Sequence, residues 1–179
     1  MKEYFPVIIF FLRFFGVYIL LTWLYSAYLQ PYVEVHQIAD PFTYWVSNSA
    51  AALLNAVGFQ AESVQYAQET YTQLVLNGRD TALVNEGCNA LSVMIIYLSF
   101  IFAFFTTWWK TLAYAIFGII ILHLTNIVRI AIITYIYRFH PEHARMAHDF
   151  LFPAIIYGMV VLLWLFWIFY VVKPLKARS

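Results

Sequence analysis

The stretch Leu112–Tyr137, which reads LAYAIFGIIILHLTNIVRIAIITYIY, decides the fold class of this chain. It contains one charged residue, Arg129, and it is longer than the roughly 20 apolar residues that a helix needs to cross a bilayer. The whole chain of 179 residues has the same character, with 64% hydrophobic and 11% charged residues. This composition predicts an integral membrane protein.

Three further segments are apolar enough to span a membrane, namely Val7–Leu29, Asn89–Trp109 and Phe150–Val172. The first is longer than the apolar core of about 7 to 15 residues in a signal peptide, and no clear A-x-A site follows it, so we interpret it as a retained helix. Because no repeat, low-complexity stretch or flexible linker interrupts the chain, we expect a single polytopic membrane domain over residues 1–179.

The polar region 30–87 separates the first two spans and divides into two parts. Residues 41–59 are moderately apolar and include Trp45, which fits an interfacial or re-entrant helix, with a fifth crossing as the alternative. Residues 70–85 alternate β-forming residues around Asn77-Gly78, a two-residue hairpin signal. The expected fold is therefore an all-α membrane protein of about four transmembrane helices with a small extracytoplasmic β-hairpin.

Basic residues near the helix ends predict the topology, because Lys and Arg remain mostly on the cytoplasmic side. With four crossings, both termini are cytoplasmic and residues 30–87 face outward, whereas a crossing by residues 41–59 would move Lys2 outward. This conflict favours the non-crossing interpretation. The cytoplasmic set is Lys2, Lys110, Lys173, Lys176 and Arg178, and the opposite set is Arg79, Arg138 and Arg145.

With this topology, three reactive side chains reach one depth from different helices. Cys88, the only cysteine, begins the second span at its outer end, and His148 precedes the fourth span. Arg129 lies roughly 12 Å below Tyr137 at a rise of about 1.5 Å per residue. Alone, Cys88 is either inert packing or a nucleophile, and the convergence favours the nucleophile.

Arg129 carries the strongest energetic argument, because an arginine within a membrane helix costs about 2.5 to 3.5 kcal/mol on insertion scales. Asn126 precedes it by three residues and therefore shares its helical face. The structural alternative is an ion pair between Arg129 and Glu86. The functional interpretation places Arg129 beside a cleft in which negative charge develops.

His140, His143 and His148 could be ligands of a metal ion, because His140-x-x-His143 is followed closely by His148. No cysteine pair accompanies them, so we predict no metal site. His140 and His143 are expected to be solvated. His123 is expected to form an interhelical hydrogen bond within the membrane. The sequence also contains no phosphate-binding loop and no basic nucleic-acid patch.

Three motifs resemble the exosortase/archaeosortase family of membrane transpeptidases: GCNAL at Gly87–Leu91, NIVRI at Asn126–Ile130, and AHDF at Ala147–Phe150. The short chain is most similar to the exosortase F subgroup. Many exosortases have Cys-Ser-Gly or Cys-Ala-Gly where this chain has Cys88-Asn89-Ala90. Larger relatives also carry additional membrane helices.

The resemblance implies that Cys88 is the nucleophile, Arg129 the oxyanion stabiliser and His148 the general acid/base, with Asn126 in support. It also implies that no cofactor is needed and that the partners are exported proteins whose C-terminal sorting signal comprises a motif, a transmembrane helix and a basic end. We expect the enzyme in the bacterial cytoplasmic (inner) membrane, with its site facing the extracytoplasmic side. The alternatives are a purely proteolytic intramembrane cysteine protease and a noncatalytic assembly factor or transporter subunit.

Overall fold

The computed structural model describes residues 4–173. Lys2, Lys176 and Arg178 of the predicted cytoplasmic set lie outside the described residues. Short π-helical turns adjoin the helices at Pro31–His36, Ala147–Leu151 and Trp167–Val172. The elements in chain order are α1 (Phe5–Gln30), α2 (Pro41–Ala56), β1 (Ala61–Gln65), β2 (Thr72–Leu76), β3 (Arg79–Val84), α3 (Leu91–Ala103), α4 (Trp108–Phe139), α5 (Ala144–Met146) and α6 (Phe152–Phe166).

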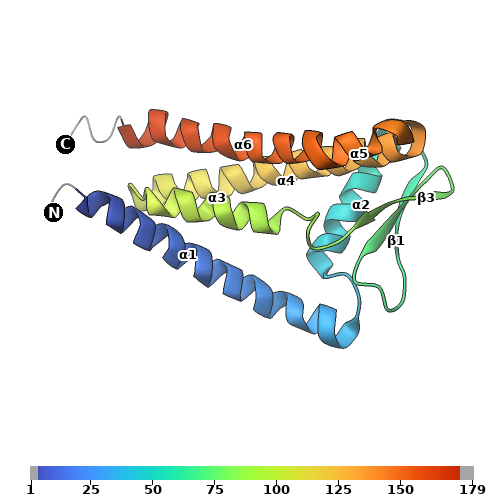
Figure 1. Ribbon diagram of the computed structural model, residues 1–179, viewed down its shortest axis with the longest axis horizontal. Coiled ribbons are helices and arrows are strands. Elements are labelled where there is room, and N and C mark those ends of the chain that lie inside the picture. Colours follow the sequence, from blue (N-terminus) through green and yellow to red (C-terminus); the bar gives the residue numbers. More distant parts are fainter. Residues whose placement is uncertain (1–3, 174–179) are drawn as a thin grey trace.

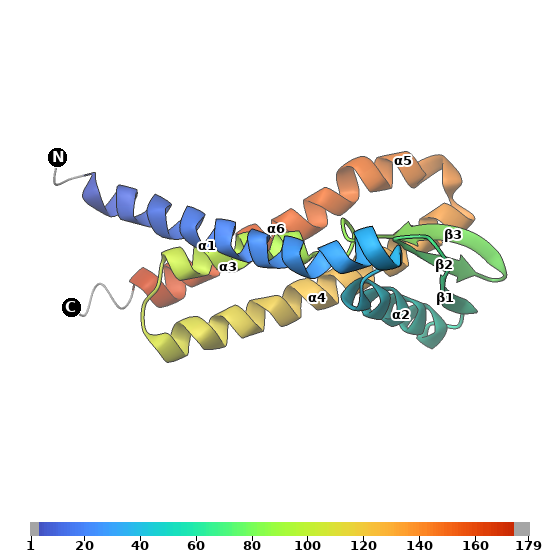
Figure 2. The same ribbon diagram turned by 90° about the horizontal axis from the view of Figure 1, so that it is seen from below.

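Four helices, α1, α3, α4 and α6, form a bundle, and α2 and the strands form a cap at one end of it (Figure 1). The first and last described residues lie together at the opposite end, as Figures 1 and 2 both show. The bundle core is apolar and aromatic, with Tyr97 of α3, Leu122 of α4 and Trp167 after α6 fully buried. The chain therefore runs twice from the end that holds the first and last described residues to the cap and back.

The predicted all-α membrane fold is confirmed, with one difference in the second span. Three helical segments are long and apolar enough to cross a membrane, namely Phe5–His36, Trp108–Phe139 and Pro141–Val172. Helix α3 is instead only 13 residues long, so it rises about 20 Å against a hydrocarbon thickness of about 30 Å. Helix α3 alone is therefore too short to cross the hydrocarbon layer.

Helix α2 is an element of the cap and is not among the three candidate spans. It begins at Pro41 after Asp40, whose carboxylate accepts the backbone N–H groups of Phe42 and Thr43. An aspartate N-cap followed by proline is a strong helix start. Its buried face, including Val46 and Ala50, packs against the sheet and α4.

The cap sheet contains the predicted hairpin and a third strand that was not predicted. Strands β2 and β3 pair around Asn77 and Gly78, which both have positive φ, as a two-residue type I′ turn requires. Strand β1 pairs antiparallel with β2. Its sequence AESVQ is too polar to predict a strand, and it is held by the partner strand and by α2.

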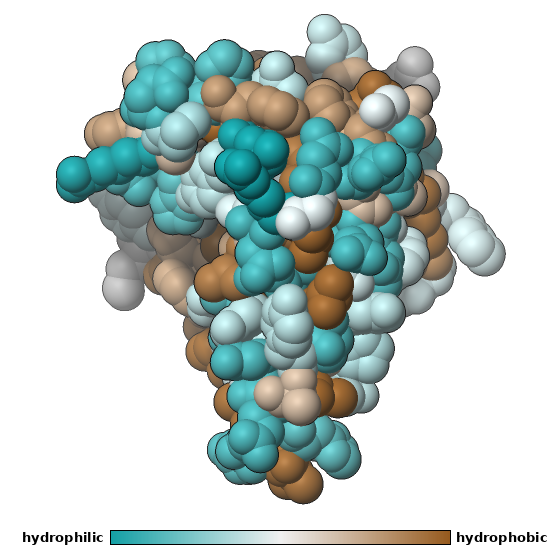
Figure 3. All heavy atoms as spheres, turned by 90° about the vertical axis from the view of Figure 1, so that its right-hand side faces the viewer, coloured by the Kyte–Doolittle hydropathy of each residue, from teal (hydrophilic) through white to brown (hydrophobic). Residues whose placement is uncertain are grey.

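The surface separates into a hydrophilic cap and an apolar bundle. Figure 3 looks onto the cap end, where hydrophilic residues dominate. Along the bundle, α1 buries none of its side chains within the protein, and large apolar residues of α4 and α6 are also exposed. Such a belt is what a bilayer covers, so the bundle is the membrane part of the molecule.

Candidate active site

Cys88 lies in a non-helical loop between β3 and α3. Its N–H donates to the Asn85 carbonyl oxygen at 2.9 Å, and α3 begins only at Leu91. The helix therefore begins two residues after Asn89, the predicted start of the span, which is within the few residues to which such ends are predictable. The reason is Ala90, which adopts the left-handed conformation with φ of 66° and so separates the loop from the helix.

This loop can lie at membrane depth because protein groups satisfy its backbone. Irregular backbone is tolerated there only where it is buried in protein or lines an aqueous cavity. The Asn126 amide nitrogen donates to the Cys88 carbonyl oxygen at 2.8 Å. The Tyr25 hydroxyl donates to the Glu86 carbonyl oxygen at 3.4 Å. Helices α4 and α1 thus hold the loop from two sides.

Asn89, directly after the cysteine, is a fully buried anchor. Its amide nitrogen donates to the Thr43 hydroxyl at 2.9 Å and to the Tyr25 hydroxyl at 3.2 Å. Its amide oxygen accepts the N–H of Leu91 at 2.9 Å. Because all these bonds are made in a buried site, the position of Asn89 fixes that of its neighbour Cys88.

The anchor continues to the start of α2 through Asp40. The Thr43 hydroxyl, which accepts from Asn89, donates in turn to the Asp40 carboxylate. The Tyr28 hydroxyl donates to the same carboxylate at 3.0 Å. This network was not predicted from the sequence, although Asp40-Pro41 has the aspartate–proline pattern of a helix start.

Arg129 is joined to the cysteine loop through Asn126. The guanidinium Nη1 donates to the Asn126 amide oxygen at 3.0 Å, while the amide nitrogen of Asn126 binds the Cys88 carbonyl. Asn126 is fully buried and Cys88 is partly buried. One amide side chain therefore bridges the thiol-bearing loop and the cation.

The arginine keeps free hydrogen-bonding capacity. Its Nε is buried and has no acceptor among residues 4–173, and no carboxylate in that range lies within 4.0 Å, so the alternative pairing with Glu86 is not observed. The guanidinium lies 6.0 Å from the Phe152 ring centre. Arg129 also borders a pocket of about 290 Å³ where α4 and α6 meet. The lining of this pocket includes Val128, Ile132 and Ile155.

His148 lies at the same end of the bundle but does not contact the other two residues. Its Nδ1 is 3.0 Å from an oxygen of Asp149, and its side chain is 61% exposed. No hydrogen bond connects it to Cys88 or Arg129 in the described part of the chain. Phe152, which faces Arg129, follows His148 by four residues and is buried, whereas His148 is exposed.

The other histidines follow two different patterns. His140 and His143 are exposed and lie 3.5 Å and 3.8 Å from Glu142. The expected hydrogen bond of His123 is not observed, because its ring stacks on Trp45 at 4.3 Å and its buried Nδ1 has no partner in the described residues. No group of three potential metal ligands occurs among residues 4–173.

The comparison with protein families places these residues in a known context. The family model of transmembrane exosortases matches residues 8–171, which is most of the chain. The chain belongs to the transmembrane exosortase family. The match covers the whole site of this exosortase but does not assign the F subgroup. No curated protein and no solved structure shows detectable similarity to the chain.

This exosortase has alanine where the Cys-Ser-Gly or Cys-Ala-Gly sequence of many exosortases has glycine, and the backbone conformation shows the cost of that difference. Ala90 occupies the glycine position and has a φ of 66°. Glycine adopts such a conformation without steric cost, whereas an L-residue pays roughly 1–2 kcal/mol for it. The Ala90 methyl group is buried against the bundle core, and this burial offsets part of the cost.

Proposed function

We propose that this exosortase is a membrane-embedded cysteine transpeptidase. It cleaves the C-terminal sorting tail of exported proteins and transfers them to an acceptor at the outer face of the bacterial cytoplasmic membrane. The observation that carries the proposal is the bridge from the Cys88 loop through Asn126 to Arg129. A buried amide that holds both the backbone of the cysteine loop and a cation favours a role in acyl transfer over simple packing.

The first step is attack by the Cys88 thiolate on a backbone carbonyl of the substrate next to the tail. The carbon–sulfur bond forms while the carbonyl oxygen becomes an oxyanion. Arg129 stabilises that charge with guanidinium N–H groups other than the Nη1 donor that binds Asn126, and its buried Nε has no other acceptor among residues 4–173.

His148 supplies the proton that the leaving amine needs. The contact with Asp149 favours the tautomer that carries a proton on Nδ1, so Nε2 is free to take a proton from the thiol. The imidazolium then protonates the leaving nitrogen as the carbon–nitrogen bond breaks. A thioester between Cys88 and the exported protein remains, and the tail departs with its new amino terminus.

The second half of the reaction resolves the thioester. An acceptor amine attacks the thioester carbonyl, the carbon–sulfur bond breaks, and the acceptor proton passes through His148 to the departing thiolate of Cys88. With water as the nucleophile the same steps give simple proteolysis. The pocket beside Arg129 supports lateral access from the bilayer, because Val128 and Ile132 on its wall belong to the exposed apolar belt.

Coexpression with a tail-anchored substrate tests the proposal. The tail is followed by immunoblotting, and the new C-terminus by mass spectrometry, for wild type, Cys88→Ala and Cys88→Ser. We expect tail removal by the wild type alone and a product mass that includes an acceptor. A product ending in a free carboxylate identifies the proteolytic alternative. Tail removal by both variants would overturn the assignment of Cys88.

The melting temperature, which is measured without substrate, separates a loss of catalysis from a loss of packing. Removing the thiol of a partly buried cysteine costs about 1 kcal/mol or less, so Cys88→Ser should melt close to the wild type in detergent. Arg129→Lys keeps the charge but loses the guanidinium fork, and we expect it to lower turnover about a hundredfold. Wild-type turnover in Arg129→Lys would overturn the role of the guanidinium group in stabilising the oxyanion and leave Arg129 a structural residue.

A further inference from the structure

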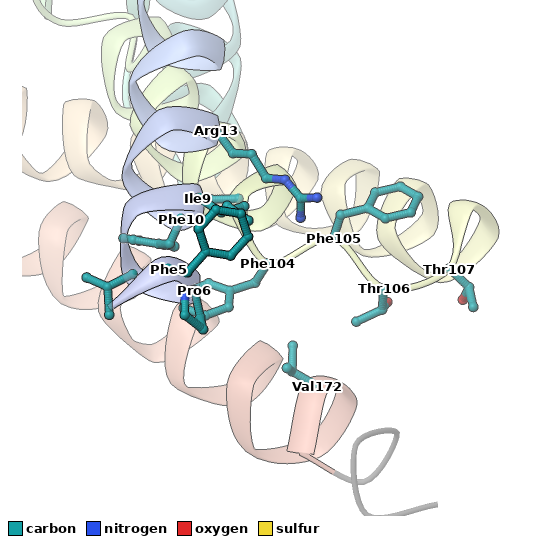
Figure 4. Close-up of a pocket in the computed structure, with 12 residues that line it drawn as sticks. Phe5, Pro6, Ile9, Phe10, Arg13, Phe104, Phe105, Thr106, Thr107 and Val172 are labelled. Atoms are coloured by element: carbon teal, nitrogen blue, oxygen red, sulfur yellow. The ribbon is translucent and has the colours of Figure 1, made fainter. Parts of the chain in front are cut away.

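A second site lies at the opposite end of the bundle from the cysteine. It is a pocket of about 790 Å³ between the start of α1, the α3–α4 connection and the residues after α6. Figure 4 shows aromatic rings on its walls and the Arg13 side chain extending from α1 toward Phe105. The pocket is larger than the one beside Arg129 and contains no residue of the candidate active site.

Arg13 is an unexplained cation in an apolar helix. It lies eight residues after Phe5, about 12 Å along α1, and neighbours Phe14 and Leu12. An arginine in such a helix is costly and usually marks a function or a partner. Among the residues that the structure describes, no acidic side chain or hydrogen-bond acceptor pairs with Arg13. The Arg13 side chain is exposed and so remains available to a ligand.

The charge at this end of the molecule favours an anion. Lys110 at the start of α4 and Lys173 after α6 lie at the same end as Arg13. The acidic residues of the described chain all belong to the cap end or to the segments that lead into it. No carboxylate within residues 4–173 therefore neutralises the three cations at this end of the molecule, of which Arg13 lines the pocket.

The walls of the pocket favour an apolar chain next to that anion. Phe5, Phe10 and Phe104 line it together with Ile9 and Val172. Thr106 and Thr107 add hydroxyl groups near the connection to α4. Because Phe5 and neighbouring residues of α1 are exposed toward the lipid belt, a molecule from the bilayer reaches the pocket directly.

We propose that this pocket binds an anionic phospholipid. Its phosphate pairs with Arg13 and accepts from the threonine hydroxyls, and one acyl chain lies against the phenylalanine rings. Basic pockets between membrane helices recognise acidic head groups in this way. A basic peptide is excluded by the three cations, and free phosphate would leave the aromatic wall uncovered. The proposal does not depend on the peptidase activity.

Native mass spectrometry of the full-length protein in detergent tests this proposal, with equimolar phosphatidylglycerol and phosphatidylcholine of identical acyl chains. About 1 kcal/mol per basic residue corresponds to a preference of about fivefold for the anionic lipid. We expect Arg13→Gln to abolish this preference while leaving phosphatidylcholine binding unchanged, and Arg13→Lys to retain most of it. Arg145→Gln is the matched control, because it removes a cation that is 95% exposed at the cap end.

Three outcomes overturn the proposal. Equal binding of the two lipids by the wild type would show that the pocket does not select an anionic head group, whatever the variants do. An undiminished preference in Arg13→Gln would place the selection elsewhere. Displacement of the lipid by millimolar inorganic phosphate would identify a free-anion site and would also contradict it.

Discussion

Cys88 and Arg129 are joined through a single side chain, because the Asn126 amide donates to the Cys88 carbonyl oxygen at 2.8 Å and accepts from Arg129 at 3.0 Å. The orientation of the guanidinium and the position of the cysteine loop are therefore coupled. Residues that act as one unit give non-additive effects when they are substituted.

A double-mutant cycle on turnover measures this coupling. We expect Asn126→Leu to lower tail cleavage roughly tenfold to a hundredfold, because it releases Arg129 and leaves the Cys88 carbonyl unpaired. Adding Arg129→Lys should then cost much less than Arg129→Lys costs alone. Strictly additive losses in the rate of tail cleavage would show that Asn126 does not link the two residues in function.

Thr43 should be needed for both stability and turnover. Its buried hydroxyl bridges Asn89 and Asp40, so Thr43→Val leaves polar groups of both without a partner and should cost about 1–3 kcal/mol. Thr134→Val is the matched control. Thr134 is equally buried, but its hydroxyl bonds only the Ile130 carbonyl of its own helix. Thermal melting in detergent compares the two, and equal losses would contradict the role of the network.

Ala90 provides a test of backbone strain beside the nucleophile. Ala90→Gly removes the strain of the left-handed conformation, which stabilises the folded protein by about 1–2 kcal/mol. The variant also loses a buried methyl group and gains backbone entropy in the unfolded state, and each of these destabilises it by about 0.5–1 kcal/mol. Ala90→Gly should therefore melt close to the wild type. Ala90→Val adds a β-branched residue at positive φ and should lose about 2 kcal/mol or more. Unchanged melting of Ala90→Val would argue against the observed conformation.

The sequence predicts the membrane helices better than their ends. The second span was predicted over Asn89–Trp109 because hydrophobicity indicates residence in the bilayer, whereas the helix stops at Ala103. The run Phe104–Thr107 is apolar or uncharged, so its non-helical backbone leaves no hydropathy signal. The hairpin was predictable because Asn77-Gly78 is a local signal, but β1 depends on its partner strand.

The site shows the same division between local and long-range information. The shared face of Asn126 and Arg129 follows from their spacing on one helix. The bond between Thr43 and Asn89 joins residues 46 positions apart, and no local pattern encodes it. Position in the sequence placed His148 at the cap end, but only the structure shows its contact with Asp149.

Gly118 should be essential for the packing of α3 against α4. A Cβ atom at this position would overlap the Tyr97 ring and hydroxyl, which are fully buried and bonded to the Tyr114 carbonyl at 2.7 Å. Gly118→Ala should therefore cost about 1–3 kcal/mol or more, although alanine favours helices. Gly158→Ala is the matched control, since nothing lies within 4 Å of its Cβ position. Similar melting temperatures for the two variants would refute this packing.

Asp149 should assist His148 as a positioning residue. Its oxygen lies 3.0 Å from Nδ1 of the imidazole, so Asp149→Asn weakens the preference for the tautomer that leaves Nε2 free. We expect the maximal rate of tail cleavage to fall about tenfold to a hundredfold with little change in the substrate concentration at half-maximal rate. Glu142→Gln, which alters an exposed carboxylate beside His140 and His143, should leave the rate unchanged. If Asp149→Asn raised only the half-maximal substrate concentration, Asp149 would contribute to substrate binding and not to proton transfer.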